Sequence, residues 1–122
     1  MSDTPDSLWP IDLTFNRTDR QLEISFNDGK EFKLPFELLR VESPSAEVQG
    51  HGGDQKKIVP GKSLVNVEQA KPQGNYAVRL VFDDGHDTGI FSWDYLYELG
   101  TNQDAIWATY LAALTNAGLT RG

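Results

Sequence analysis

The chain has 122 residues, of which 39% are hydrophobic, and this size fits one domain with one core. Its formal net charge is -7 and its pI is about 4.6. Because an acidic surface repels phosphate backbones, these values argue against a nucleic-acid partner. The sequence contains no cysteine, which excludes disulfides, thiolate nucleophiles, cysteine-ligated iron–sulfur clusters and cysteine-based zinc sites within this chain.

The amino-terminal stretch MSDTPDSLWP has neither a basic segment nor an apolar one, so it does not predict a signal peptide. No apolar run approaches the roughly 20 residues that a membrane helix needs. We therefore expect a cytoplasmic protein without membrane contacts. Residues 1–9 are polar and contain proline, and we expect a flexible tail there, followed by a single domain over residues 10–122.

Apolar residues alternate with polar ones in the first third of the chain, a pattern typical of half-buried strands. In the first of these segments, Ile11 falls on the face expected to point inward. Asn27-Asp28-Gly29 is typical of a hairpin turn, because glycine tolerates positive φ. Pro35 then suits the first turn of a short helix over residues 35–40. The pattern predicts three strands, over residues 11–15, 21–26 and 31–34.

A long segment from Ser43 to Ser63 is rich in glycine, proline, serine and charge, and a loop of this length in a small domain is either functional or mobile. The strongest alternation in the chain comes later, at YAVRLVF, where Tyr76 and Phe82 fall on the expected inward face. The sequence DDGHDTG then predicts a turn. In this half we expect strands over residues 64–70, 76–82 and 89–91.

Two helices are expected near the carboxyl terminus. Ser92 can cap the first, over residues 92–99. Thr101 and Asp104 resemble a capping box for the second, and Gly118 followed by leucine fits a Schellman stop. The second helix carries an apolar stripe at helical spacing, made of Ile106, Trp107, Tyr110, Leu111 and Leu114.

Two segments, ISFNDGKEFKLPFELL and LVFDDGHDTGIFSWDYL, share the order strand, Asp-Gly turn, short strand and helix. Internal duplication and hairpin chemistry arising twice both explain this similarity. The elements together predict an α+β fold, a small antiparallel sheet with short helices and a C-terminal covering helix.

Two stretches, LRVESPSAEVQGHG and GNYAVRLVFDDGHDTGIFSWDYLYEL, resemble the gamma-butyrobetaine hydroxylase-like N-terminal domain family, and the resemblance extends over about residues 11–100. Small bacterial members of this family have unknown function. A similar module precedes the catalytic domain of gamma-butyrobetaine and trimethyllysine hydroxylases, and a related segment occurs in some plastid Mrp-type iron–sulfur carrier proteins. The 122 residues do not include that catalytic domain, so we expect no dioxygenase activity from them, and whether they have another enzymatic activity stays open.

In the hydroxylases, the resemblance implies a structural zinc held by three cysteines and one histidine. The matching positions in this chain are Ser43, Ser45, Val48 and His86. Because hydroxyl and apolar groups cannot replace thiolates, we do not expect that zinc site here.

The expected function is a non-catalytic binding or adaptor module that acts on an unknown protein partner through the 43–51 loop and the 84–88 turn. If the two segments lie together, as in the relatives, their polar side chains form one surface. Its expected partner-binding residues are Ser43, Ser45, Glu47, Gln49, His51, Asp84 and His86.

The alternative is a metal-handling protein, linked to iron or iron–sulfur delivery by analogy with the plastid carriers. His51 and His86 with Glu47, or with an aspartate in its place, would then hold iron or zinc, since two imidazoles and a carboxylate suit these metals. The competing explanation is that both histidines lie at turn tips and that His86 hydrogen-bonds its own loop. No cofactor is otherwise expected, and the oligomeric state is open.

Other chemistry is less well supported. DDGHDTG lacks the ligand register of a calcium loop, and Gly61-Lys62-Ser63 lacks the earlier glycine of a phosphate-binding loop. Ser43 and Ser45 have no nucleophile elbow and no identifiable fixed base, so no catalytic set emerges. The aromatic residues of the C-terminal half are expected to pack in the core, although Tyr95 and Tyr97 fall on different sides of their helix.

Overall fold

The structure is a computed structural model that describes residues 8–50 and 56–122. Ten elements follow one another along the chain: β1 (Pro10–Asn16), β2 (Gln21–Phe26), β3 (Glu31–Pro35), α1 (Phe36–Val41), α2 (Ala46–Gln49), β4 (Val67–Gln73), β5 (Ala77–Phe82), β6 (Ile90–Ser92), α3 (Trp93–Thr101) and α4 (Gln103–Ala117). The fold is α+β, as the sequence predicts.

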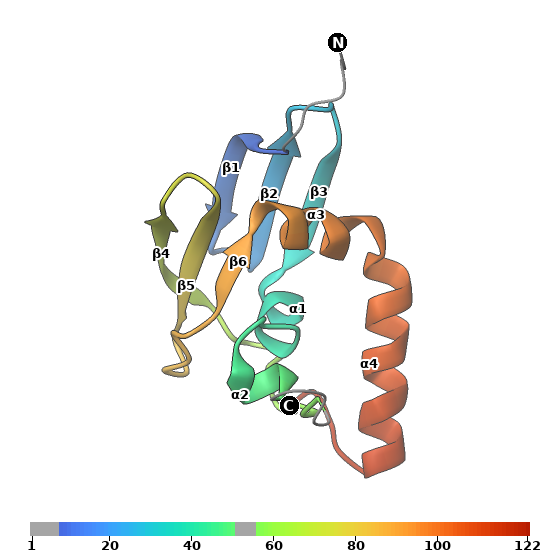
Figure 1. The fold of residues 1–122 in the computed structure, drawn as a ribbon. Helices are drawn as coiled ribbons and strands as arrows, with labels where there is room; N and C mark the ends of the chain where they lie inside the picture. The colour runs from blue at the N-terminus through green and yellow to red at the C-terminus, as the bar shows by residue number, and fades with distance from the viewer. Residues whose placement is uncertain (1–7, 51–55) are drawn as a thin grey trace.

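The strands form two antiparallel three-stranded sheets rather than one, with orders β1-β2-β3 and β4-β5-β6. Each sheet is a simple meander followed by a helix, α1 after the first and α3 after the second, so the two similar sequence segments occupy equivalent places. Figure 1 shows the two sheets side by side, with α1 and α2 beyond one end of them and α4 along one side.

A single core joins both sheets to α1 and α3. The strand β2 alternates between half-buried and buried side chains, as period-two patterning requires. Full burial of each large apolar side chain contributes roughly 1.5–3 kcal/mol, so this cluster is the main source of stability. Its buried members are Leu22, Ile24, Phe26, Leu34, Phe36, Leu38, Leu39, Val65, Val67, Val78, Leu80, Phe82, Phe91, Leu96 and Leu99.

Two side chains expected to point inward are exposed. Ile11 is 66% exposed because the β1–β2 register shifts between Pro10 and Asp12, and a bulge turns the side chain away from the core. Tyr76 is 60% exposed because β5 begins only at Ala77, which leaves the tyrosine in the preceding turn.

The strand β4 begins later and runs further than expected. Leu64, expected within the strand, precedes it and is 71% exposed. At its other end, β4 continues through Pro72, which pairs with Val78. Proline is tolerated there because β4 is an edge strand and needs ladder hydrogen bonds on one side only.

The caps of the two C-terminal helices follow the predictions in part. The Ser92 hydroxyl accepts a hydrogen bond from the backbone N–H of Tyr95 at 3.1 Å and so caps α3. The residue before α4 is Asn102, so the expected capping role of Thr101 is wrong, and that threonine ends α3. At the other end of α4, Gly118 adopts the left-handed conformation and completes the predicted Schellman stop.

The helix α4 extends the core at one side of the molecule. Tyr110 and Leu114 are buried in a small cluster with Val41 of α1, while Trp107 contacts both this cluster and the main core. Leu111, expected in the buried stripe, is 37% exposed. No helix in the described part of the chain combines the length and the apolar character that a membrane span requires.

The last residues of the chain are fastened to the rest of the domain. Arg121 forms a double hydrogen bond with the buried carboxylate of Glu37, with Nη2–Oε1 at 2.7 Å and Nε–Oε2 at 3.0 Å. The same guanidinium lies 5.3 Å from the centre of the Trp107 ring, within the range of a cation–π contact. Backbone hydrogen bonds from Gly61 to Thr120 and from Ser63 to Arg121, both 3.0 Å, attach this segment to the loop before β4.

Candidate functional site

The loop after α1 and the turn between β5 and β6 lie against each other, as expected. Nε2 of His86 lies 2.9 Å from Oγ of Ser43 and 3.4 Å from Oγ of Ser45. Nδ1 of the same ring lies 3.1 Å from Oε1 of Glu47. Thr88, in the turn, donates a hydrogen bond to that carboxylate oxygen at 2.8 Å. One imidazole therefore joins two segments that are 43 residues apart in sequence.

The close approach of the two segments depends on Gly89. A Cβ atom at this position would lie 2.3 Å from Oγ of Ser43 and 3.1 Å from the ring of Phe91. Both distances are shorter than side-chain contacts normally allow. A residue without a side chain is therefore required for the loop to reach His86.

Both ring nitrogens of His86 lie beside polar side chains. Nδ1 faces the Glu47 carboxylate, and Nε2 is hydrogen-bonded to the Ser43 hydroxyl, in which the donor depends on the tautomer of the ring. Burial of the ring and the positive charge of Arg40 lower the pKa of His86. Three carboxylates, those of Glu47, Asp84 and Asp87, oppose this shift. The ring is therefore neutral at pH 7, with both nitrogens engaged.

Asp84 fixes the backbone of the turn. Its carboxylate accepts a hydrogen bond from the backbone N–H of His86 at 3.0 Å, and ion pairs to Arg40 at 2.8 Å and to Lys62 at 2.7 Å. Partial burial opposes its ionisation, but the hydrogen bonds from Lys62, the His86 N–H and Arg40 outweigh that effect and lower its pKa to about 2. The turn is thereby tied to both α1 and the loop before β4.

The start of the 43–51 loop is held from the other side as well. The amide of Gln49 donates to the backbone oxygen of Ser43 at 2.9 Å. The buried carboxylate of Glu42 pairs with Lys56, and the Tyr95 hydroxyl donates to the backbone oxygen of Glu42. Burial, with the nearby charge of Glu42, raises the pKa of Tyr95 far above its usual value, so this hydroxyl keeps its proton.

The expected site residues divide into buried and exposed groups. Ser43, Ser45 and His86 are buried and join the loop to the turn, and their expected part in partner binding stays a prediction. The side chain of Glu47 is 62% exposed, and Gln49 is half-buried. His51 lies outside the described residues, and its expected part in partner or metal binding stays a prediction.

Ser43, His86 and Glu47 lie in a row like that of a serine hydrolase, with a hydrogen bond between Ser43 and His86 and a 3.1 Å contact between His86 and Glu47. The sequence does not reveal this fixed position of His86. However, Ser43 is 0% exposed, so no substrate carbonyl can reach its hydroxyl in this conformation. The row is therefore a structural connection and not a nucleophile ready for reaction.

The family model for the gamma-butyrobetaine hydroxylase-like N-terminal domain matches residues 13–97. The chain belongs to this family. Among solved structures, a protein determined by NMR in solution is 51% identical with a TM-score of 0.82, over 99% of this chain and 90% of that one. A second NMR solution structure is 46% identical with a TM-score of 0.79, over 92% of this chain and 88% of that one.

A third relative is a protein of unknown function of the DUF971 family from Acidithiobacillus ferrooxidans ATCC 23270, determined by crystallography. It is 42% identical with a TM-score of 0.63, over 75% of this chain and 91% of that one. No curated protein matches the chain. Family membership, expected from the sequence, is thus confirmed, and the relatives carry no assigned activity.

Three of the four positions that match the zinc ligands of the larger family members, Ser43, Ser45 and His86, come together here, but the set does not fit zinc. The hydroxyls of Ser43 and Ser45 take the places of two thiolates beside His86, and the third place is a buried valine, Val48. Neutral hydroxyls and an apolar side chain are not zinc ligands. Across residues 8–50 and 56–122, no three histidine, cysteine or acidic side chains are grouped so that they could hold a metal ion.

Proposed function

We propose that this member of the gamma-butyrobetaine hydroxylase-like N-terminal family is a non-catalytic binding module whose partner docks on the face made by the 43–51 loop and the 84–88 turn. One observation carries the proposal: Glu47 is exposed and yet fixed in position. Its Oε1 accepts a hydrogen bond from Thr88 and lies 3.1 Å from Nδ1 of His86, while its side chain stays 62% open to solvent.

A fixed exposed carboxylate is suited to recognition. A free surface glutamate loses rotamer freedom when a partner immobilises it, at a cost of roughly 0.5–1.5 kcal/mol. In this protein the fold has already restricted the Glu47 side chain through the hydrogen bond from Thr88 and the contact with the His86 ring. Oε2 has no hydrogen-bond partner within the described residues and can accept from a partner. The complementary group is an ammonium or guanidinium of a basic polypeptide.

Most other carboxylates on this face are paired with cationic side chains, so a basic partner is expected to be recognised mainly by Glu47. Asp84 is neutralised by Arg40 and Lys62, and Asp87 lies beside Arg79. Glu47, paired only with a neutral imidazole, is therefore the carboxylate whose charge is least compensated. At longer range, the net charge of -7 favours the approach of a basic partner. The proposal keeps the cytoplasmic location expected from the sequence, which cell fractionation can test.

The test is a pull-down from the protein's own cells with matched charge variants. Glu47→Gln keeps the side-chain shape and an acceptor for His86 and Thr88 but removes the charge. Glu31→Gln, an exposed residue at the start of β3, removes the same charge away from the face and serves as the control. We expect a basic protein to be captured by the wild type and the control and to be lost with Glu47→Gln.

Equal recovery with all three baits would contradict the proposal. His86→Ala is unsuitable as a bait, because removal of a buried and doubly hydrogen-bonded ring would alter the whole loop.

A further inference from the structure

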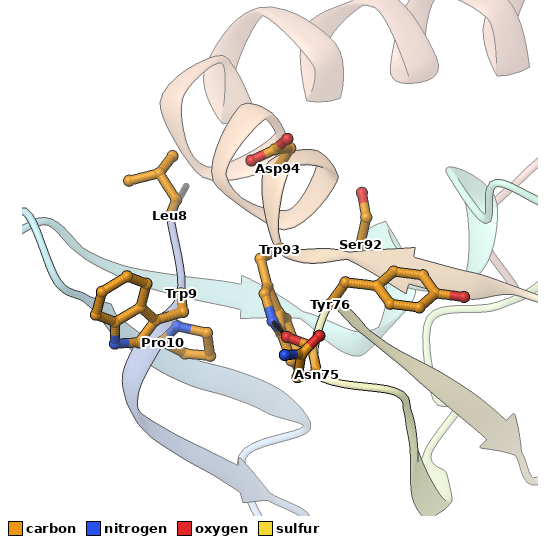
Figure 2. Close-up of a pocket in the computed structure, with 8 residues that line it drawn as sticks. All are labelled: Leu8, Trp9, Pro10, Asn75, Tyr76, Ser92, Trp93 and Asp94. Carbon is orange, nitrogen blue, oxygen red and sulfur yellow. Dashed lines mark hydrogen bonds between the residues drawn. The ribbon is translucent and has the colours of Figure 1, made fainter. Parts of the chain in front are cut away.

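A groove lies at the other end of β5 from the His86 turn. It has a volume of about 780 Å³, and its lining includes Leu8, Trp9, Pro10, Tyr76, Trp93 and Asp94. Figure 2 shows the Trp9 and Pro10 rings on one side of the view, the Trp93 ring beside Asn75 in the middle, and Leu8 and Asp94 above them. The groove thus brings together the start of β1, the turn before β5 and the first turn of α3.

The aromatic walls are held in place. Trp9 is bound through its backbone to Asn27, with N–Oδ1 at 3.3 Å and a return bond from the Asn27 N–H to the Trp9 oxygen at 3.0 Å. The indole N–H of Trp93 donates to the backbone oxygen of Asn75 at 2.9 Å, and its backbone N–H donates to Tyr76 at 3.1 Å. Trp9 and Tyr76 nevertheless remain 49% and 60% exposed, so their side chains are open to a ligand.

Among the described residues that line the groove, Asp94 is the one charged side chain, and none is cationic. Asp94 is exposed and forms no ion pair within the described residues. It lies in the first turn of α3, where the helix end carries roughly half a positive charge. The full negative charge of the carboxylate exceeds this, so the local field favours a cation.

A guanidinium is already bound by an indole ring and a carboxylate elsewhere in this domain. Arg121 lies over the indole of Trp107 at 5.3 Å and is paired at 2.7 Å with the carboxylate of Glu37. The groove offers the same two kinds of group, indole rings from Trp9 and Trp93 and a carboxylate from Asp94, without an arginine of its own.

We propose that this groove binds an arginine side chain of a partner polypeptide, with the guanidinium against the indoles of Trp9 and Trp93 and paired with Asp94. Guanidinium suits the site better than ammonium, because it is planar, stacks on aromatic rings and pairs with a carboxylate through two N–H groups. This site is separate from the Glu47 face and does not depend on the function proposed for that face.

The test is a titration of the untagged full-length protein with acetyl-Gly-Arg-Gly-amide, followed through the indole N–H signals in NMR spectra. The signals of Trp9 and Trp93 are expected to shift to saturation. The signal of Trp107, which does not line the groove and is already in contact with Arg121, serves as an internal reference. In a second peptide, citrulline replaces arginine and keeps a planar side-chain group of similar shape without the charge. In a third peptide, lysine keeps the positive charge but lacks the planar guanidinium group. Both are expected to bind more weakly than the arginine peptide.

Matched variants locate the binding. Asp94→Asn is expected to weaken binding about two- to five-fold, the range of an exposed cation–carboxylate contact. Asp104→Asn, which changes an aspartate in the first turn of α4, is expected to have no effect. Trp9→Ala should also weaken binding, and its exposed position preserves the fold. Glu47→Gln should leave binding unchanged, which keeps this test independent of the pull-down.

Three results would overturn the proposal. The first is the absence of a Trp9 or Trp93 shift up to the solubility limit of the arginine peptide. The second is equal affinity for the citrulline or the lysine peptide. The third is an equal effect of Asp94→Asn and Asp104→Asn.

Discussion

The turn after β5 and the turn before it differ in what they bury. The first has buried polar side chains, and the second has exposed aromatic side chains. After β5, the polar groups of Ser43, Ser45 and His86 are buried and satisfied by one another. Before β5, the aromatic side chains of Trp9 and Tyr76 remain exposed around a groove. Buried polar groups are costly unless they are paired, so the first region is rigid and sensitive to substitution. Exposed aromatic groups contribute little to folding and are free to bind.

The largest expected effect comes from introducing thiolates into the buried region. Ser43→Cys/Ser45→Cys/Val48→Cys, together with His86, would supply a Cys3His set, which suits tetrahedral zinc. We expect zinc to raise the free energy of unfolding of this variant by about 4 kcal/mol when free zinc is roughly 1,000 times its Kd. Thermal unfolding with zinc and with EDTA measures the change.

The same measurement on the wild type is expected to show no such stabilisation. Adding His86→Ala to the triple variant should weaken zinc binding, because the fourth ligand is lost. A triple variant whose unfolding does not respond to zinc would show that the four positions do not converge into one metal site.

The next largest effect is the loss of His86. We expect His86→Ala to lower the free energy of unfolding by about 3 kcal/mol, because it leaves a cavity and removes hydrogen-bond partners from Ser43 and Glu47. Trp9→Ala at the groove should cost less than about 1 kcal/mol, although it removes a larger side chain. Urea unfolding at pH 7 measures both, and similar losses would contradict the contrast between the two regions.

An intermediate effect is expected at Gly89. Its new Cβ in Gly89→Ala would lie 2.3 Å from Oγ of Ser43, and such overpacking costs about 2 kcal/mol. Ser43→Ala removes that oxygen, so the double variant should recover part of the loss. A double-mutant cycle is expected to show a coupling of about 1 kcal/mol. Strictly additive losses would mean that the loop does not approach Gly89 closely.

The smallest effect is the pH dependence due to Asp84. Its pKa is lowered in the folded protein, so its ion pairs stabilise the fold fully above its usual pKa of 3.8, and this contribution disappears as the pH falls towards 2. As the pH is lowered through this range, the urea concentration at the unfolding midpoint should fall less steeply for Asp84→Asn than for the wild type. Lys62→Gln should give an intermediate dependence on pH. If neither variant changes this pH dependence, the ion pairs of Asp84 are not its cause.

Local sequence patterns predict much of the fold but miss features that depend on long-range register. The alternation in QLEISF predicts β2 and its buried face, because each inward residue meets the same core. The exposure of Ile11 follows from a bulge that only pairing with β2 creates, and Pro72 is compatible with a strand only because β4 lies at an edge. Neither property is encoded within a window of neighbouring residues.

The candidate site shows the same division. Family resemblance predicts that the SPSAEVQGHG loop approaches the His86 turn, whereas periodicity alone does not. The Ser43–His86–Glu47 row could not be predicted, because it needs two segments 43 residues apart at hydrogen-bond distance. The sequence does not predict the groove for two reasons. Trp9 falls in the segment expected to be a tail, and the alternating pattern places Tyr76 on the buried face of β5.

The hydrogen bonds that hold the last residues against the loop before β4 have a practical consequence for these experiments. Thr120 and Arg121 are hydrogen-bonded to the loop that carries Lys62, the partner of Asp84, and Figure 1 shows this end of the chain near α2. An affinity tag fused after Gly122 would emerge beside the docking face and could itself obstruct or mimic a partner. Baits for the pull-down should therefore be immobilised through an exposed side chain of β3 or α4, such as a cysteine introduced at Lys33 or Thr115.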